Sequence, residues 1–181
     1  MKNSNFVAVL AALIGCFSMV SPAAAQSTKQ TNKVNAQSTE QTNNVKVVRE
    51  GVGFDGIRVG RSTEADIIKK FGKNYKIKNF KKYSYQMIYP EGFSFYICQS
   101  DKRKQIFDIE LRTPFEAKTS RGITLGKSTL DDIYKIYGKN ADGSLQYKGV
   151  SFYYVNRKGK KIVSVIDIVE SSGIRQCEGN K

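Results

Sequence analysis

Histidine and tryptophan are absent from the chain, and cysteine and proline occur only three times each among its 181 residues. A chain without histidine has no Ser–His or Cys–His catalytic pair and no imidazole ligand for a metal ion. Acidic residues are also scarce, with 16 Asp and Glu against 30 Lys and Arg. We therefore expect no catalytic residue, no metal and no cofactor, and we interpret the chain as a protein that is not an enzyme.

The first 25 residues have the features of an export signal. Lys2 supplies a positive start, Phe6 to Val20 is apolar, and a run of three alanines precedes Gln26. This pattern predicts a signal peptide over residues 1–25 and a secreted or periplasmic protein. The alternative is a lipoprotein signal, in which Cys16 is lipidated and anchors the chain to a membrane. No later stretch of the sequence is apolar for long enough to cross a bilayer.

Residues 26–46 consist largely of Gln, Asn, Ser and Thr. So little of this segment can be buried that ordering it would not offset the lost chain entropy, and we predict a disordered tether.

The excess of cations favours a partner that is an acidic protein or an anionic envelope surface. Alternatively, the excess of positive charge serves only to keep the protein soluble. We expect no nucleic acid partner, and contact with a membrane only if Cys16 is lipidated.

One motif occurs twice, at residues 56–74 and 122–140, and the two copies align without a gap. The identical pairs are Ile57 and Ile123, Gly60 and Gly126, Ser62 and Ser128, Thr63 and Thr129, Asp66 and Asp132, Ile67 and Ile133, Gly72 and Gly138, and Asn74 and Asn140. Such self-similarity is typical of repeated structural units. We predict two units, residues 47–115 and 116–181, which are each small for an independent core and therefore pack together.

Each copy of the motif is predicted to contain a short helix. Thr63 and Thr129 stand at the N-cap position, and an aspartate follows each of them at the third position. Thr-x-x-Asp is a capping-box pattern, because the threonine hydroxyl accepts a hydrogen bond from a free amide at the helix start. Gly72 and Gly138 are expected to end the helices as left-handed C-caps. The apolar helix faces comprise Ile67, Ile68, Phe71, Ile133, Ile136 and Tyr137.

Strands are expected after each helix. Alternating or aromatic-rich segments predict strands over residues 83–89, 92–98, 106–111, 149–155 and 162–169. In both units a polar, basic turn precedes the last strand, at residues 100–104 and 156–161. The predicted fold is α+β, with two tandem β-α-β-β-β repeats whose short helices pack on an antiparallel sheet.

The repeated motif reads Ile-x-x-Gly-x-Ser-Thr-x-x-Asp-Ile-x-x-x-(Phe/Tyr)-Gly and is followed by antiparallel strands. It resembles the unit shared by the beta-lactamase inhibitory proteins and the SmpA/OmlA (BamE-like) envelope lipoproteins. The resemblance covers about residues 52–169, and the inhibitors carry two such units in tandem. It implies a binding or assembly module without catalysis.

Two stretches that look like catalytic motifs have simpler explanations. Residues 122–129 have three residues between their glycines, where a phosphate-binding loop needs four. A turn followed by an N-cap accounts for them instead. Asp108 and Glu110 alternate onto one face of a strand, and the aligned residues of the second unit are Ser164 and Ile166. We interpret the two acids as solvent-exposed residues of an edge strand.

Cys98 and Cys177 are the cysteines that remain after removal of the signal peptide. An even number of cysteines outside the cytoplasm predicts a disulfide, which would tie the C-terminal segment to the strand at residues 92–98. Two independent thiols are the alternative.

The predicted partner-binding surface combines one sheet face with the two basic turns. Alternation points Phe93, Phe95 and Ile97 toward the helix, so Tyr96, and Tyr153 in the second unit, lie on the opposite face. Tyrosine suits protein binding because it supplies contact area and a hydroxyl at low entropy cost. The predicted partner-binding residues are Tyr96, Tyr153, Lys102, Arg103, Lys104, Arg157, Lys158, Lys160 and Lys161.

Taken with the resemblance, these features predict an exported, non-enzymatic binding protein, with inhibition of another protein as one form of that function. The alternative is an envelope-assembly or surface-attachment module that binds anionic lipid or glycan. Lipidation of Cys16 would favour the alternative, and a soluble, disulfide-bonded chain beginning at Gln26 would favour the first function.

Overall fold

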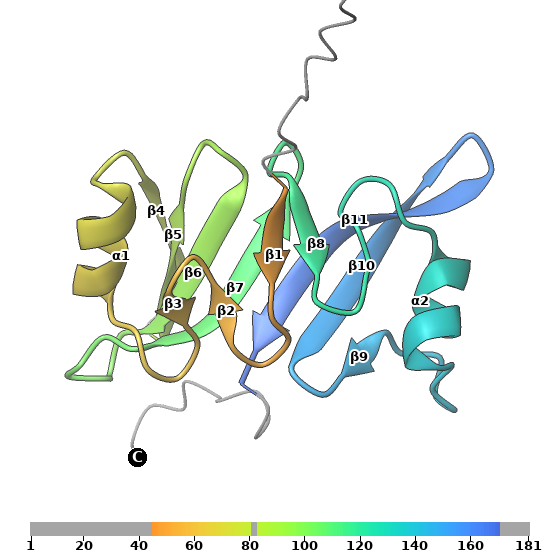
Figure 1. Ribbon diagram of the computed structural model, residues 1–181. Helices are drawn as coiled ribbons and strands as arrows, with labels where there is room; N and C mark the ends of the chain where they lie inside the picture. Colours follow the sequence, from red (N-terminus) through yellow and green to blue (C-terminus); the bar gives the residue numbers. More distant parts are fainter. Residues whose placement is uncertain (1–44, 81–82, 171–181) are drawn as a thin grey trace, which may run out of the picture. The chain divides into compact units, whose positions relative to one another are not determined.

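The computed structural model describes residues 45–80 and 83–170 (Figure 1). The predicted signal peptide, nearly all of the predicted tether, and Cys177 lie outside the described residues. The described helices are α1 (Glu64–Phe71) and α2 (Leu130–Tyr137). The described strands are β1 (Lys46–Val48), β2 (Gly53–Phe54), β3 (Ile57–Arg58), β4 (Lys76–Phe80), β5 (Ser84–Ile88), β6 (Phe93–Cys98), β7 (Ile106–Arg112), β8 (Ala117–Thr119), β9 (Gln146–Tyr147), β10 (Val150–Arg157) and β11 (Lys160–Val169).

Seven strands form one sheet in the order β4-β5-β6-β7-β11-β10-β9, and every neighbouring pair in it is antiparallel. Its middle strands, β7 and β11, come from distant parts of the chain and pair with Glu110 opposite Asp167 and Ile109 opposite Ile168. The predicted α+β class and the large antiparallel sheet are confirmed, and strands make up much more of the fold than helices do.

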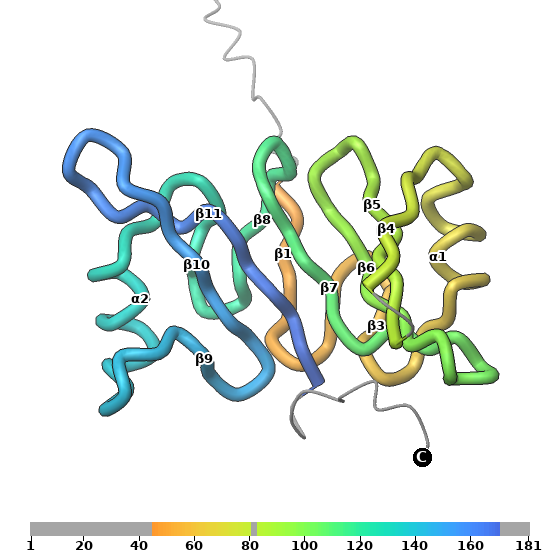
Figure 2. Tube along the Cα trace, turned by 180° about the vertical axis from the view of Figure 1, so that it is seen from behind, coloured from red at the N-terminus to blue at the C-terminus, as the bar shows by residue number. Residues whose placement is uncertain are grey.

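The hydrophobic core lies on one face of this sheet. Phe93, Phe95 and Ile97 of β6 are at most 5% exposed, which confirms the facing predicted from alternation. Ile67 of α1 and Ile133 of α2 are fully buried in the same core. Figures 1 and 2 show α1 and α2 near the two ends of the sheet, with β1, β2 and β8 between them on the core side. Figure 2, seen from behind, shows no described helix or strand packed on the opposite face.

Both helices begin at the predicted threonines. Thr63 accepts a hydrogen bond from the amide of Asp66 at 3.4 Å, and the Asp66 carboxylate accepts one from the Thr63 amide at 2.8 Å. Thr129 and Asp132 make the same two bonds at 3.2 and 2.7 Å. Each capping box therefore satisfies amides that a helix start leaves free. Neither of these described helices is long and apolar enough to cross a membrane.

The helix ends differ from the prediction in one detail. Gly72 and Gly138 have the positive φ expected of C-cap glycines, at 79° and 88°. Their ψ angles are −167° and 168°, however, so neither is in the left-handed helical conformation. The chain leaves each helix in an extended direction, which leads directly into the polar segment that follows.

The second basic turn is shorter than predicted. β10 continues to Arg157 and β11 begins at Lys160, so only Lys158 and Gly159 form the turn. Both have positive φ, 49° and 78°, which is the geometry of a two-residue turn whose twist matches that of the strands. The β10–β11 hairpin therefore carries Arg157, Lys160 and Lys161 on its strands.

A parallel pair, β1 with β8, joins the start of the described chain to its middle. Beside it, the carboxylate of Glu50 accepts hydrogen bonds from the Tyr137 hydroxyl at 2.5 Å, from the Arg121 amide at 3.3 Å and from the Ser120 hydroxyl. Burial opposes ionisation of Glu50, but the bonds from Ser120 and Tyr137 outweigh it and hold the pKa of that carboxyl below its usual value. The segment that precedes α1 is thereby fastened to α2. We did not predict this contact.

Candidate functional site on the outer face of the sheet

We term the sheet face opposite the core the outer face. Strand pairing and alternation bring eight polar side chains together on its central strands. They are Ser94 and Tyr96 of β6, Asp108, Glu110 and Arg112 of β7, Asp167 of β11, and Ser151 and Tyr153 of β10.

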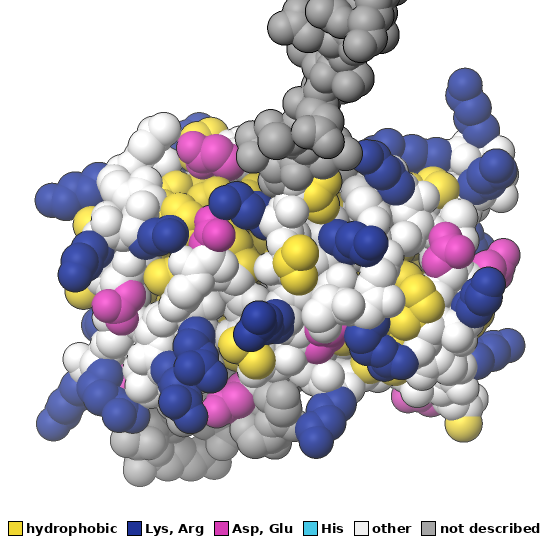
Figure 3. All heavy atoms as spheres, viewed as in Figure 1, with side chains coloured by type: hydrophobic (Ala, Val, Ile, Leu, Met, Phe, Trp, Pro, Cys, Tyr) yellow, Lys and Arg dark blue, Asp and Glu magenta, His cyan; other side chains and the backbone are white. Residues whose placement is uncertain are grey.

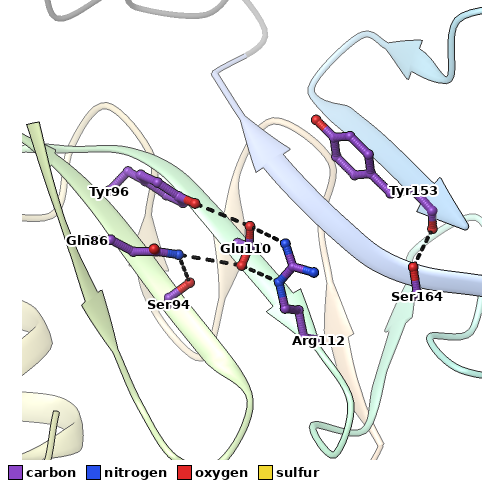
Figure 4. A network of polar contacts seen from close by, with 7 residues as sticks. All are labelled: Gln86, Ser94, Tyr96, Glu110, Arg112, Tyr153 and Ser164. Carbon is purple, nitrogen blue, oxygen red and sulfur yellow. Dashed lines mark hydrogen bonds and ion pairs between the residues drawn. The ribbon is translucent and has the colours of Figure 1, made fainter. Parts of the chain in front are cut away.

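Glu110 lies at the centre of a hydrogen-bond network (Figure 4). Arg112 holds its carboxylate with two bonds, Nε to Oε1 at 2.5 Å and Nη2 to Oε2 at 2.9 Å. The Tyr96 hydroxyl donates to Oε2 at 3.2 Å, and the Gln86 amide donates to Oε1 at 3.5 Å and to the Ser94 hydroxyl at 2.7 Å. Bidentate bonds from arginine to a carboxylate are strong and directional. The network therefore fixes the positions of these side chains.

Asp108 and Asp167 flank this network and are far less well satisfied. Asp167 is only 9% exposed. Oδ1 of each carboxyl is buried without a hydrogen-bond partner among the described residues. Burial raises the pKa of Asp108 to about 8, and the nearby charges of Asp167 and Glu110 add to the effect. Burial and Glu110 likewise raise the pKa of Asp167 to about 7, while Arg112 and a hydrogen bond from the Tyr153 side chain act in the opposite direction.

Such groups are uncommon in a folded protein. Buried polar atoms almost always have a hydrogen-bond partner, and strongly shifted carboxyl groups gather at functional sites. A carboxyl that keeps its proton near neutral pH donates a hydrogen bond, and it accepts one when it is ionised. The two Oδ1 atoms are themselves buried, so a partner cannot reach them directly, whereas the partly exposed Asp108 side chain still offers it surface. Within residues 45–80 and 83–170, no acidic or cysteine cluster is placed to hold a metal ion.

The interpretation of Asp108 and Glu110 as exposed acids of an edge strand is wrong. β7 lies between β6 and β11, so both residues are in the middle of the sheet. The repeat comparison aligned Glu110 with Ile166, but antiparallel pairing of β7 with β11 places Asp167 opposite Glu110 instead. One signal was available in the sequence, because Asp108 and Asp167 each stand between two large apolar residues.

The two predicted tyrosines occupy different environments on this face. Tyr96 is half-buried and donates its hydroxyl to Glu110, so it belongs to the network itself. Tyr153 is 53% exposed and lies on the neighbouring part of the face (Figure 4). Tyr153 is therefore the predicted tyrosine that a partner can reach most directly.

The basic residues do not gather on the outer face. β7 and β11 are antiparallel, so the turns that precede them lie at opposite ends of the sheet (Figures 1 and 2). The first turn carries Lys102, Arg103 and Lys104, and the second hairpin end carries Arg157, Lys158, Lys160 and Lys161. Lysine and arginine side chains are also spread widely over the core side of the molecule (Figure 3). The two predicted basic groups therefore cannot form one continuous patch with each other.

Cys98 is 6% exposed and disulfide-bonded. Its predicted partner, Cys177, lies outside the described residues, so the pairing stays a prediction.

Compared with models of protein families, with curated proteins and with solved structures, the chain shows no significant match.

Proposed function

We propose that this chain is an exported, non-enzymatic binding protein whose protein partner docks on the outer face of the sheet. The observation that carries the proposal is the pair of buried carboxyl groups, Asp108 and Asp167, whose Oδ1 atoms have no partner among the described residues. A buried polar group without a hydrogen bond destabilises a fold. A partner cannot bond to these buried atoms directly, but docking beside the partly exposed Asp108 can offset their cost through hydrogen bonds to the rest of the polar cluster.

Two further features support docking on this face. The Glu110 network is held in place before any partner arrives, so binding it requires little reordering of side chains. Tyr153 adds an exposed aromatic ring beside the carboxyl groups, and buried tyrosines contribute strongly to protein interfaces. Inhibition of the bound protein is one outcome of such docking.

We also propose that the chain is built from two tandem β-α-β-β-β units, residues 47–115 and 116–181, related to the unit of the beta-lactamase inhibitory proteins and the SmpA/OmlA lipoproteins. The support is that α1 and α2 begin at equivalent capping boxes and that each precedes a long antiparallel pair, β6–β7 or β10–β11. On this view β4 is an addition to the first unit.

Photo-crosslinking tests the docking face. A photoreactive phenylalanine at position 153 is expected to give one protein adduct in the exported fraction of the native host. The same group at Lys135, an exposed residue of α2, serves as the control and is expected to give none. Excess unlabelled wild-type chain should compete the adduct, and the variant Tyr153→Ser should compete about tenfold less well or worse. An adduct that wild type does not compete, or the same adduct from both positions, would contradict the proposal.

A second candidate, attachment to an anionic envelope surface, is favoured by the basic hairpin of β10 and β11. Co-sedimentation with vesicles of phosphatidylglycerol and of phosphatidylcholine distinguishes it. Here we expect binding to the anionic vesicles that weakens with salt and is reduced when Lys158, Lys160 and Lys161 are replaced by serine. Equal sedimentation with both vesicle types would exclude an electrostatic attachment.

A further inference from the structure

The two edges of the sheet differ in how well they are protected. One edge is β4, which carries Lys76 and Lys78, and lysines on an edge strand discourage a further strand from pairing. At the other edge β9 covers only Val150 and Ser151 of β10. Beside residues 153–157 of β10, no described strand occupies that side.

The backbone of this uncovered stretch directs hydrogen-bonding groups away from the sheet. The Phe152 amide donates a hydrogen bond of 3.0 Å to the carbonyl of Leu145, which precedes β9 on the edge side. Backbone groups of successive strand residues point to alternate sides, so those of Tyr154 and Asn156 also point to the edge. Consistent with this alternation, the Tyr153 carbonyl points toward β11, where it accepts a hydrogen bond of 3.3 Å from the side-chain hydroxyl of Ser164.

Space and apolar surface for another strand lie beside this stretch. A hollow of about 300 Å³ is lined by residues 144–146 before and within β9 and by residues 151–154 of β10. Tyr153, Tyr154 and Val155 are 53, 40 and 40% exposed, so both faces of the stretch present apolar side chains. An added strand would continue the line of β9 and cover part of this surface.

Charge indicates what kind of strand fits. Residues 150–166 contain Arg157, Lys158, Lys160 and Lys161 and no acidic residue. A second copy of this chain would bring the same positive hairpin and the same net charge of +14, which opposes self-association. An acidic segment is attracted instead.

We propose that an extended, acidic segment of a partner protein adds to the sheet as a strand beside residues 153–157 of β10. Backbone bonds to Tyr154 and Asn156 would set its register, and its carboxylates would pair with Arg157 and the lysines of the turn. This surface is the sheet edge, which shares Tyr153 with the outer face but binds through the backbone of Tyr154 and Asn156, so the inference goes beyond the proposed function and tests of those amides can fail separately from it.

Titration calorimetry on the full chain tests the inference with three short synthetic peptides. The first alternates valine and glutamate, the second is the same peptide with N-methyl groups on alternate amides, and the third alternates valine and lysine. We expect saturable binding of the first, binding weaker by about tenfold or more for the second, and none for the third. Hydrogen exchange should show protection of the Tyr154 and Asn156 amides by the first peptide.

A matched pair of variants tests the same edge from the side of the protein. Asn156→Pro removes an outward amide and leaves the bonds to β11 in place, whereas Asn156→Ala keeps the amide. We expect the proline variant to lose about tenfold in affinity for the valine–glutamate peptide and the alanine variant to bind as wild type does. Circular dichroism confirms that both variants are folded.

Several results would overturn the inference. These are failure of the valine–glutamate peptide to bind, equal binding of its N-methylated form, and equal binding of the lysine peptide. A dimer of the chain that Asn156→Pro abolishes would assign the edge to a second copy instead. Tyr153 borders both surfaces, so an adduct at position 153 does not by itself separate them, whereas the N-methylated peptide and Asn156→Pro report on the edge alone.

Discussion

At pH 8, the variant Asp108→Asn is expected to be more stable than the wild type by about 2 kcal/mol, which corresponds to a rise of roughly 4–8 °C in Tm for a chain of this size. Asp108 is buried beside Asp167 and Glu110, and its pKa is raised to about 8. Asparagine has nearly the same shape and carries no ionisable group. The substitution therefore removes the free-energy cost of burying the Asp108 carboxyl beside Asp167 and Glu110.

The pH dependence identifies the cause. The pKa of Asp108 is about 8 in the folded chain and near its ordinary value of 3.8 in the unfolded chain. Below about pH 4 both states are protonated, and Asp108 then imposes no ionisation penalty. As the pH rises from about 4 to 8, the unfolded state has lost the proton and the folded state keeps it, so stability falls. The advantage of Asp108→Asn should therefore grow across that interval, and urea unfolding at several pH values measures it.

Asp66→Asn is the matched control with the opposite sign. Bonds from the backbone amide and the hydroxyl of Thr63 hold the pKa of Asp66 below its usual value. This carboxylate therefore contributes stability above its unfolded pKa, and that contribution is lost as the pH falls through the folded pKa. We expect Asp66→Asn to destabilise the chain at neutral pH and to approach the wild type in acid. If Asp108→Asn lowered the stability by the same amount at pH 4 and at pH 8, the raised pKa of Asp108 could not be the cause.

Gly149→Ala is expected to lower the free energy of unfolding by about 3 kcal/mol or more. A Cβ at this position would lie 2.4 Å from the backbone nitrogen of Gly51 and 2.6 Å from its Cα. The Gly51 amide donates to the Gly149 carbonyl at 2.8 Å, so the turns before β2 and before β10 are in direct backbone contact. Backbone on both sides cannot move away as a flexible side chain does, and the added methyl would separate the two segments.

Gly143→Ala separates this clash from simple backbone strain. Gly143 has a φ of 70°, close to the 80° of Gly149, but a Cβ there meets nothing within 4 Å. Its substitution should cost only about 1 kcal/mol, the penalty of a left-handed conformation for alanine. Denaturant unfolding of both variants gives the comparison. Equal losses would mean that the contact with Gly51 contributes nothing beyond the conformation itself.

Local features were predictable from the sequence because their causes are local. Thr63 and Thr129 start helices through bonds that reach only three residues along the chain. The side-chain period of a strand likewise assigned Phe95 to the core and Tyr96 to the opposite face. These predictions required no knowledge of which segments become neighbours in space.

The candidate site could not be predicted without knowing which strands become neighbours in space, and the sequence does not show this. The repeat comparison aligned β7 with β11 residue by residue and in the same direction, whereas the two strands meet antiparallel. Asp167 therefore went unrecognised as the neighbour of Glu110. The parallel pairing of β1 with β8 was missed for a similar reason, because two three-residue segments carry too little pattern to predict a partner.

The place of β11 in the sheet also governs the order in which the fold can form. β11 is the last described strand along the chain, yet it lies between β7 and β10. The strands β4 to β7 can pair with one another as soon as they are made, but β9 and β10 pair with none of them, and only residues 160–169 join the two groups of strands into one sheet. A chain interrupted before Lys160 would leave an unpaired edge on β7 and a separate hairpin of β9 and β10. Assembly is thus completed at the centre, and the two halves become one sheet only in that last step.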